Sequence, residues 1–258
     1  MDPHLLIAIV LSALIGVSLG LLGGGGSILA VPLLVYVAQI DVRTAIEMSL
    51  PVVGATSLAG AVVHGRAGRV DKRAAVMFGG AGMIAAPLGA ELTHLVSPRA
   101  LILLFATIMI VVAVLMLRPG RAGPPADAPP ARRLALGGAG LTIGFLTGFL
   151  GVGGGFLIVP ALTLLGKLPI RTAIGTSLLV IAMNSAAGLA SHLRHGVMPL
   201  NLTAAFGASA MIGALLGVRF SNKIAPLHLR RAFGVFVLLL GLSLLVANLL
   251  SEGGTRGR

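Results

Sequence analysis

The stretch GLLGGGGSILAVP at residues 20–32 returns as GFLGVGGGFLIVP at residues 148–160. The separation of 128 positions holds without a gap further along the chain, where RTAIEMSLPVV (43–53) matches RTAIGTSLLVI (171–181). Each copy opens with an apolar helix that is interrupted by glycines, a pattern typical of secondary transporters. The sequence therefore predicts two copies of one membrane repeat, each of about 120 residues.

The composition places these repeats in a membrane. Hydrophobic residues make up 57% of the chain and charged residues 10%, against roughly 45–50% and about 25% in soluble domains. Because apolar runs long enough to span a bilayer occupy most of the sequence, the expected fold class is an all-α polytopic membrane protein. The net charge of +12 lies mainly in loops, where the positive-inside rule accounts for it, and no nucleic-acid partner is expected. The chain has no cysteine, and neither a metal nor a cofactor is expected.

Each half is expected to contain five apolar elements. They are expected at about 4–22, 27–40, 43–64, 73–94 and 99–118, and at about 134–151, 155–166, 171–192, 199–220 and 228–250. The second element of each half, at about 13 residues, reaches only ~20 Å of a ~30 Å hydrocarbon core. We therefore expect it to join its predecessor as a re-entrant hairpin or a broken helix, followed by three transmembrane helices. The expected organisation is a first repeat over 1–118, a cytoplasmic Pro/Arg linker over 119–133, a second repeat over 134–250 and a tail over 251–258.

The charges of the loops predict how the repeats are oriented. The loops at 65–73 and 219–231 and the linker are rich in arginine and lysine, whereas the segments 91–99 and 193–198 carry one arginine each. Placing the basic loops in the cytoplasm makes the two halves inverted repeats. Both termini are then expected in the periplasm of a bacterial inner membrane.

The two glycine runs form the first candidate binding site. Ser27 and Gly155 are expected to be the N-caps of the short return helices, which would leave the backbone N–H groups of residues 28–30 and 156–158 unpaired at positive helix ends. Since glycine has no Cβ, an anion could approach these groups closely. The residues expected to bind the anion here are Gly23, Gly25, Gly26, Ser27, Gly151, Gly153, Gly154 and Gly155. The alternative is that the glycines only allow helices to cross tightly.

A polar face is expected on the third element of each half. At 100° per residue, one arc holds Ser49, Thr56, Ser57, Gly60 and His64 in the first half, and Ser177, Asn184, Ser185, Gly188 and His192 in the second. We expect this face to look into the bundle, and the substrate-binding residues chosen from it are Ser49, Ser57, Ser177, Asn184 and Ser185. The alternative is ordinary packing of small residues. His64 and His192 lie at helix ends, where they either couple protons or are ordinary interfacial histidines.

Charged residues near the mouths of these helices are candidates for gating or coupling. Arg43 and Arg171 occupy equivalent positions, where each could steer an anion or instead cap a helix and contact lipid headgroups. Glu47 corresponds to Gly175 in the second half, so its charge is specific to one half. It is either a functional carboxylate or the partner of Arg43. No catalytic motif such as G-x-S-x-G or H-E-x-x-H is present, and an enzyme is not expected.

With G-x-x-G-x-G-G-G-x-x-x-V-P at 148–160 and G-T-S-L at 175–178, the second half resembles the sulfite exporter TauE/SafE family, also called the sulfonate uptake permeases. The similarity covers nearly the whole chain, and the resemblance implies transport of small sulfur-containing anions. It points to Gly23, Gly25, Gly26, Pro32, Gly151, Gly153, Gly154 and Pro160, and to Ser49 and Ser177 in the repeated S-L segment. The first half departs from G-T-S-L, because it reads Glu47-Met48-Ser49-Leu50 there.

The expected function is secondary transport of a small sulfur-containing oxoanion, sulfite or a small organosulfonate, with export as the expected direction. The anion is expected near the membrane midplane between the two glycine-rich helix breaks. The alternatives are a passive anion channel and a membrane scaffold that transports nothing. The expected partners are the anion and the lipid bilayer, while a homodimer and the identity of a coupling ion are left open by the sequence.

Overall fold

The structure is a computed structural model that describes residues 3–92, 95–118, 130–150, 155–192 and 199–253. Within these residues the elements are α1 (Pro3–Leu22), α2 (Ser27–Pro32), the π-helical turn η1 (Leu33–Val37), α3 (Val42–Arg66), α4 (Lys72–Leu92), α5 (Pro98–Leu117), α6 (Pro130–Leu150), α7 (Gly155–Leu164), α8 (Ile170–His192), α9 (Leu200–Lys223) and α10 (Pro226–Gly253). Six of these helices, α1, α3, α5, α8, α9 and α10, contain spans long and apolar enough to cross a membrane. The predicted all-α polytopic membrane fold is confirmed.

The first glycine run reverses the direction of the chain. Gly23 follows α1 with a φ of +79°, a left-handed conformation that glycine adopts without strain. Gly26 lies back against α1, where an added Cβ would be 2.5 Å from the carbonyl oxygen of Ile15. Leu34, further along the returning segment, shares a buried cluster with Ala8 near the start of α1. The first break thus forms a helical hairpin, which is the shape that the expected re-entrant form requires.

The returning segment of the first half differs from the single helix expected over 27–40. After Pro32 the helix changes to π geometry, and the N–H of Ala38 donates to the carbonyl of Leu33 at 3.1 Å. Proline has no N–H and so cannot donate an α-helical hydrogen bond. The change from α- to π-helical hydrogen bonding after Pro32 is therefore explained by the proline itself.

The two return segments end in the same way. Gln39 and Lys167, 128 positions apart, are the residues other than glycine that have a positive φ in the described chain, at +54° and +49°. The next residue in each half donates a matching backbone hydrogen bond, from Ile40 to Leu34 at 3.0 Å and from Leu168 to Leu162 at 2.9 Å. The sequence repeat is therefore also a repeat of backbone geometry.

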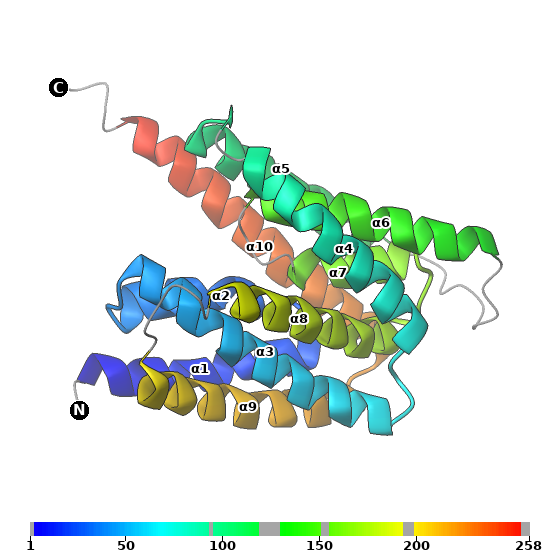
Figure 1. The fold of residues 1–258 in the computed structure, drawn as a ribbon, viewed down its shortest axis with the longest axis horizontal. Coiled ribbons are helices and arrows are strands. Elements are labelled where there is room, and N and C mark those ends of the chain that lie inside the picture. The colour runs from blue at the N-terminus through cyan, green and yellow to red at the C-terminus, as the bar shows by residue number, and fades with distance from the viewer. Residues whose placement is uncertain (1–2, 93–94, 119–129, 151–154, 193–198, 254–258) are drawn as a thin grey trace.

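Helices of the two halves pack against one another in equivalent pairs. Helix α1 packs on α9, and α6, which corresponds to α1, packs on α4, which corresponds to α9 (Figure 1). Glycines let the backbones touch at matching points, since a Cβ on Gly16 would overlap Ala210 and a Cβ on Gly144 would overlap Gly82. Each half thus completes the packing of the other.

Two pairs of equivalent helices also contact each other directly, α3 with α8 and α5 with α10. A Cβ added at Gly60 would lie 2.9 Å from Leu178, and one added at Gly188 would lie 3.2 Å from Leu50. Positions rise along α3 as they fall along α8, so these helices are antiparallel, as Figure 1 also shows. Gly54 of α3 meets Ser185 between these two contacts, and residues near it lie at the middle of the α3–α8 interface.

The two ends of the helix bundle are defined by the helices that begin and end there. Helix α1 begins and α10 ends at one end, on the left in Figure 1. The other end, where α3 ends and α4 begins, is called the α3–α4 end below. Helix α6 begins at Pro130, so residues 130–133, predicted as linker, are helical; proline suits the first turn of a helix because its missing N–H would be unpaired there. Helix α10 extends to Gly253, into the predicted tail.

Candidate functional site

The two return helices meet at their first residues. Ser27 begins α2 and Gly155 begins α7, and the two occupy equivalent positions in the repeats. A Cβ on Gly155 would overlap the Ser27 hydroxyl, and a Cβ on Gly24 would overlap the carbonyl oxygen of Gly155. The first glycine run therefore touches the start of α7 along the backbone; this contact is called the hairpin crossing below. The predicted residues Gly151, Gly153 and Gly154 lie outside the described residues.

The prediction that Ser27 is an N-cap is wrong. The N-cap is Gly26, which already has helical angles (φ −70°, ψ −26°), so the helix begins at Ser27, one residue earlier than it would with Ser27 as the cap. The Ser27 hydroxyl donates to the carbonyl of Gly24 at 2.7 Å. The N–H of Leu29 donates to the carbonyl of Gly26 at 3.1 Å, so this group is not unpaired as expected for residues 28–30.

The first break is held against α8 by Ser177. Its hydroxyl lies within hydrogen-bond distance of two carbonyl oxygens, to which it donates: Gly23 at 2.8 Å and Ile174 at 2.8 Å. The equivalent Ser49 donates to the carbonyl of Ile46 at 2.8 Å. The Ser177 proton thus holds the glycine break in place, a positioning role that its predicted assignment to substrate binding did not include.

Three buried polar atoms near the middle of the α3–α8 interface have no hydrogen-bond partner in the described part of the chain. They are Oγ1 of Thr56, Oγ of Ser57 and Oδ1 of Asn184. Thr56 and Ser57 are fully buried, and Thr56 and Asn184 occupy equivalent positions. A buried polar group without a partner costs about 1–3 kcal/mol, and such groups call for a ligand, an ion or a water.

These groups lie close to the hairpin crossing along the helices. Ile181 of α8 approaches the crossing, with its Cδ1 3.0 Å from where a Cβ on Gly155 would be. Asn184 follows Ile181 by three residues, and Thr56 follows the equivalent Val53 by the same spacing. Residues three apart share a helix face, with a rise of about 5 Å between them. Asn184 is therefore about one helical turn from Ile181, which faces the crossing, and Thr56 occupies the equivalent position on α3.

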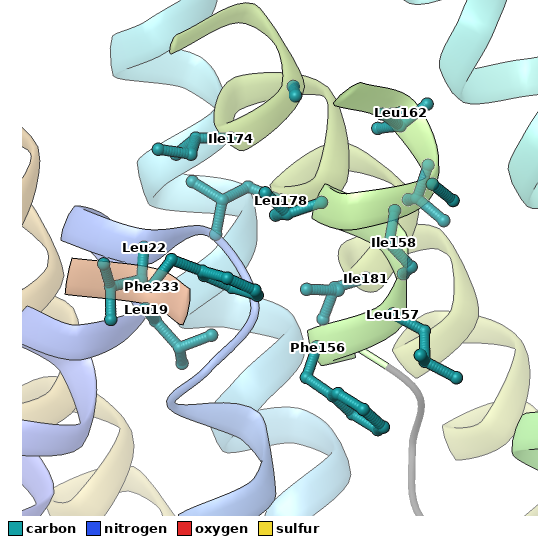
Figure 2. Close-up of a cluster of buried hydrophobic side chains, with 14 of the residues drawn as sticks. Leu19, Leu22, Phe156, Leu157, Ile158, Leu162, Ile174, Leu178, Ile181 and Phe233 are labelled. Atoms are coloured by element: carbon teal, nitrogen blue, oxygen red, sulfur yellow. The ribbon is translucent and has the colours of Figure 1, made fainter. Parts of the chain in front are cut away.

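Apolar side chains surround the crossing. Figure 2 shows Leu22 and Phe233 beside the end of α1, and Phe156 and Ile181 beside the start of α7. Gly25 is in contact with the ring of Phe236, since an added Cβ would lie 2.7 Å from it. The buried polar side chains of the described residues are serines, threonines and one histidine, with no lysine, arginine, aspartate or glutamate among them. A charged ligand bound here would be stabilised by dipoles rather than by a counter-charge.

Ser185 lies apart from the unpartnered group. It is buried against Gly54 and lines an apolar cavity of about 450 Å³ between α3 and α8. Leu58 and Met183 line the same cavity, and Leu58 is exposed. The four hydroxyls and the amide that were predicted to bind substrate together thus have different surroundings. Oγ of Ser57 and Oδ1 of Asn184 have no hydrogen-bond partner among the described residues. Ser49 and Ser177 donate to carbonyls, and Ser185 faces this cavity.

Of the predicted gating residues whose side chains are described, Arg171 and Glu47 lie toward opposite ends of the bundle. Arg171 lies at the start of α8 and donates from Nη2 to the carbonyl of Ile224 at 2.9 Å, at the C-cap of α9. Glu47 is half-buried in α3 and is not without an interaction partner. Arg43 and His192 belong to α3 and α8, but their side chains lie outside the described residues.

His64 differs from the interfacial histidine that its place at a helix end predicted. Its side chain is 1% exposed and lies next to the backbone of Gly20 in α1. The turn after α3 folds over it, because Arg69 donates its N–H to the carbonyl of His64 at 2.9 Å. Helix-end position alone does not reveal such a turn.

Two residues of this region were not among the site residues predicted from the sequence. Thr56 lies on the predicted polar face, and its equivalence to Asn184 was the signal that could have added it to the binding residues. Thr176 accepts a hydrogen bond from the N–H of Asp71 at 2.9 Å. No local signal predicts that bond, because its partners are 105 positions apart.

Comparison with known proteins finds matches over nearly the whole chain. Residues 8–244 match the family model described as sulfite exporter TauE/SafE. A probable membrane transporter protein of Xylella fastidiosa (strain 9a5c) is 37% identical over 243 residues, covering 91% of this chain and 92% of its own length. The probable membrane transporter protein YdhB of Bacillus subtilis (strain 168) is 28% identical over 247 residues, covering 93% and 100%. Both matches are long enough to include both repeats.

Proposed function

The chain belongs to the sulfite exporter TauE/SafE family and is a multi-pass membrane transporter, and we propose that it carries a small sulfur-containing oxoanion, sulfite or a small organosulfonate. The proposed binding site is the hairpin crossing together with the unpartnered polar groups of α3 and α8. The observation that carries this proposal is the meeting of the equivalent residues Ser27 and Gly155, together with the unpartnered Oγ1 of Thr56 and Oδ1 of Asn184 near the middle of the α3–α8 interface. The family's description directs the choice of substrate class, with export as the direction.

The depth of this site follows if the halves are inverted repeats, 1–118 and 134–250 joined by the linker. The antiparallel contacts between the equivalent helices α3 and α8 support that arrangement. A contact between two equivalent residues lies on the two-fold axis that relates the halves. In an inverted repeat this axis runs in the membrane plane, so the Ser27–Gly155 contact lies near the midplane, where transporters of this kind bind substrate.

Loop charge supports an orientation in a bacterial inner membrane with both termini periplasmic. The α3–α4 end carries the exposed basic residues Arg66, Lys72, Arg73, Lys223 and Arg231. The opposite end carries the acidic residues Asp41, Glu47 and Glu91 in the described chain. By the positive-inside rule the α3–α4 end faces the cytoplasm.

The chemistry of the site favours a compact oxoanion with one negative charge. Hydroxyl and amide dipoles can donate several hydrogen bonds to its oxygens, but they compensate a second charge poorly in apolar surroundings. Sulfite titrates near neutrality, so bisulfite is the form that the site would bind. Its passage would carry a proton without any carboxylate of the protein.

The proposal is tested by removing the two equivalent polar groups without changing their volume. Thr56→Val and Asn184→Leu should each weaken sulfite binding at least about tenfold, since the first removes a hydroxyl donor and the second removes the N–H donors of the amide. Both variants should melt at or above the wild-type temperature without ligand, because they remove a buried group that has no partner. The measurement is thermal unfolding of purified protein over a sulfite titration.

Thr107→Val is the matched control. This threonine is exposed on α5 and donates within its own helix to the carbonyl of Leu103 at 2.7 Å, so its substitution should leave sulfite binding unchanged. If Thr56→Val and Asn184→Leu bind sulfite as well as Thr107→Val does, the proposed site is wrong. If they lower the melting temperature without ligand, these groups stabilise the fold instead.

A further inference from the structure

The turn between α3 and α4 is docked on α8 through residues next to Ser177. The backbone N–H of Asp71 donates to Oγ1 of the fully buried Thr176 at 2.9 Å. Gly175 makes room for the turn, because a Cβ there would overlap the carbonyl oxygen of Arg69 and lie 2.8 Å from Cβ of His64. The turn is thus docked on α8 at the α3–α4 end by a hydrogen bond and a backbone contact, together called the turn contact below.

The first half cannot form an equivalent of the turn contact. The position of Thr176 is occupied by Met48, whose thioether is only a weak acceptor, and the position of Asp71 by Pro199, which has no N–H. The position of Gly175 is occupied by Glu47, whose side chain would fill the space that the turn occupies. All three changes remove the same interaction, so the turn contact belongs to the α3–α4 end alone.

The turn contact is connected to the proposed binding site. Ser177, the residue after Thr176, donates to the carbonyl of Gly23 in the first glycine break at 2.8 Å. A shift of this part of α8 therefore affects the turn on one side and the hairpin crossing on the other.

We propose that Thr176 is a positioning residue that holds the α3–α4 end closed, and that breaking its bond to Asp71 is a step in opening that end to the binding site. This inference rests on the proposed function and adds to it that the site is reached from each end in turn. The equivalent bond cannot form at the opposite end, because Pro199 has no N–H to donate, so the two ends open by different local changes.

The test measures which end gives access to the site and needs no substrate. The chain has no cysteine, so a Ser57→Cys parent, at a fully buried position, carries one reactive thiol. A membrane-impermeant maleimide is applied to sealed vesicles of each orientation. An Arg66→Cys reporter, exposed at the end of α3, identifies the vesicles whose α3–α4 end faces the reagent.

Adding Thr176→Val to the parent should raise the labelling rate about fivefold from the α3–α4 end, the factor for one hydrogen bond of ordinary strength, and not from the other end. Thr176→Ser keeps the acceptor oxygen and should label at the parent's rate. Met48→Val, at the equivalent position, should label at the parent's rate from both ends.

Three results would overturn the inference: no increase with Thr176→Val, an equal increase from both ends, or the same increase with Met48→Val. The second would mean that Thr176 only stabilises the fold. Failure of the proposed substrate gives a different pattern, in which the labelling result stands while sulfite is neither bound nor transported.

Discussion

Gly23 combines two constraints that few positions in the chain share. Its φ of +79° lies in the left-handed region, and an added Cβ would approach Ser177 Oγ to 2.7 Å and Cα of Ile174 to 2.9 Å. The first constraint disfavours any side chain, and the second places the break against α8. The reversal of the chain and its link to α8 therefore both depend on the absence of one carbon atom.

Gly23→Ala should lower the melting temperature of the purified protein and abolish sulfite-dependent stabilisation, because the new Cβ adds left-handed strain and displaces Ser177. Gly138→Ala is the control, since Gly138 is exposed in α6 and has nothing within 4 Å of an added Cβ. Its substitution should be neutral or stabilise by up to about 1 kcal/mol through helix propensity. Equal melting temperatures for the two variants would contradict this account of the break.

At the scale of elements, one basic residue of the segment predicted as a loop caps the C-terminal end of a neighbouring helix. Arg230, near the start of α10, donates from Nε to the carbonyl of Met116 at 2.8 Å and from Nη2 to the carbonyls of Arg118 and Leu115 at 3.0 and 3.2 Å. The last carbonyls of a helix lack partners within it, and a cation there also opposes the helix dipole. Arg230 therefore joins α5 to α10 in addition to its contribution to loop charge.

Arg230→Ala should destabilise the protein by about 1 kcal/mol, because it leaves the end of α5 without these bonds. Arg231→Ala removes the same charge from the exposed neighbouring position and should have little effect. Thermal unfolding of both variants at the same ionic strength checks this difference. If the two variants lose stability equally, loss of charge is the cause and the capping account is wrong.

The elements themselves could be predicted from the sequence, and their contacts could not. Apolar runs interrupted by glycine and proline have local causes, so the ten expected elements agree with the observed helices to within a few residues. The predicted N-cap at Ser27 was wrong because Gly26, the residue before it, already has helical backbone angles. The burial of His64 could not be predicted because it depends on the turn after α3. The role of Thr176 depends on a bond across 105 positions. The sequence repeat could point to a contact only where two equivalent residues meet, as Ser27 and Gly155 do.

At the scale of the whole molecule, the account depends on two halves of opposite orientation. Equivalent helices are antiparallel at the α3–α8 interface, and α1 begins at the same end of the bundle at which α10 ends (Figure 1). The proposed orientation, with the basic α3–α4 end in the cytoplasm, predicts that the segment 65–73 and its counterpart 193–201 belong on opposite sides of the membrane.

Single cysteines at Arg69, Ala126 and Val197 test this orientation in intact cells. Arg69→Cys and Ala126→Cys should resist a membrane-impermeant maleimide until the cells are opened, because both are placed in the cytoplasm. Val197→Cys should react at once. Labelling of the Ala126 and Val197 positions from the same side would contradict the inverted arrangement and the midplane depth of the site.

Sulfite flux through the purified protein in proteoliposomes tests the central claim most directly. Vesicles loaded with unlabelled sulfite should take up radiolabelled sulfite, and the rate should saturate as the external concentration rises, because each anion occupies one site. Thr56→Val should lose this exchange while Thr107→Val keeps it. Flux that rises without saturation would indicate a channel. No flux with sulfite or with any small organosulfonate, from protein that melts as expected, would contradict the account.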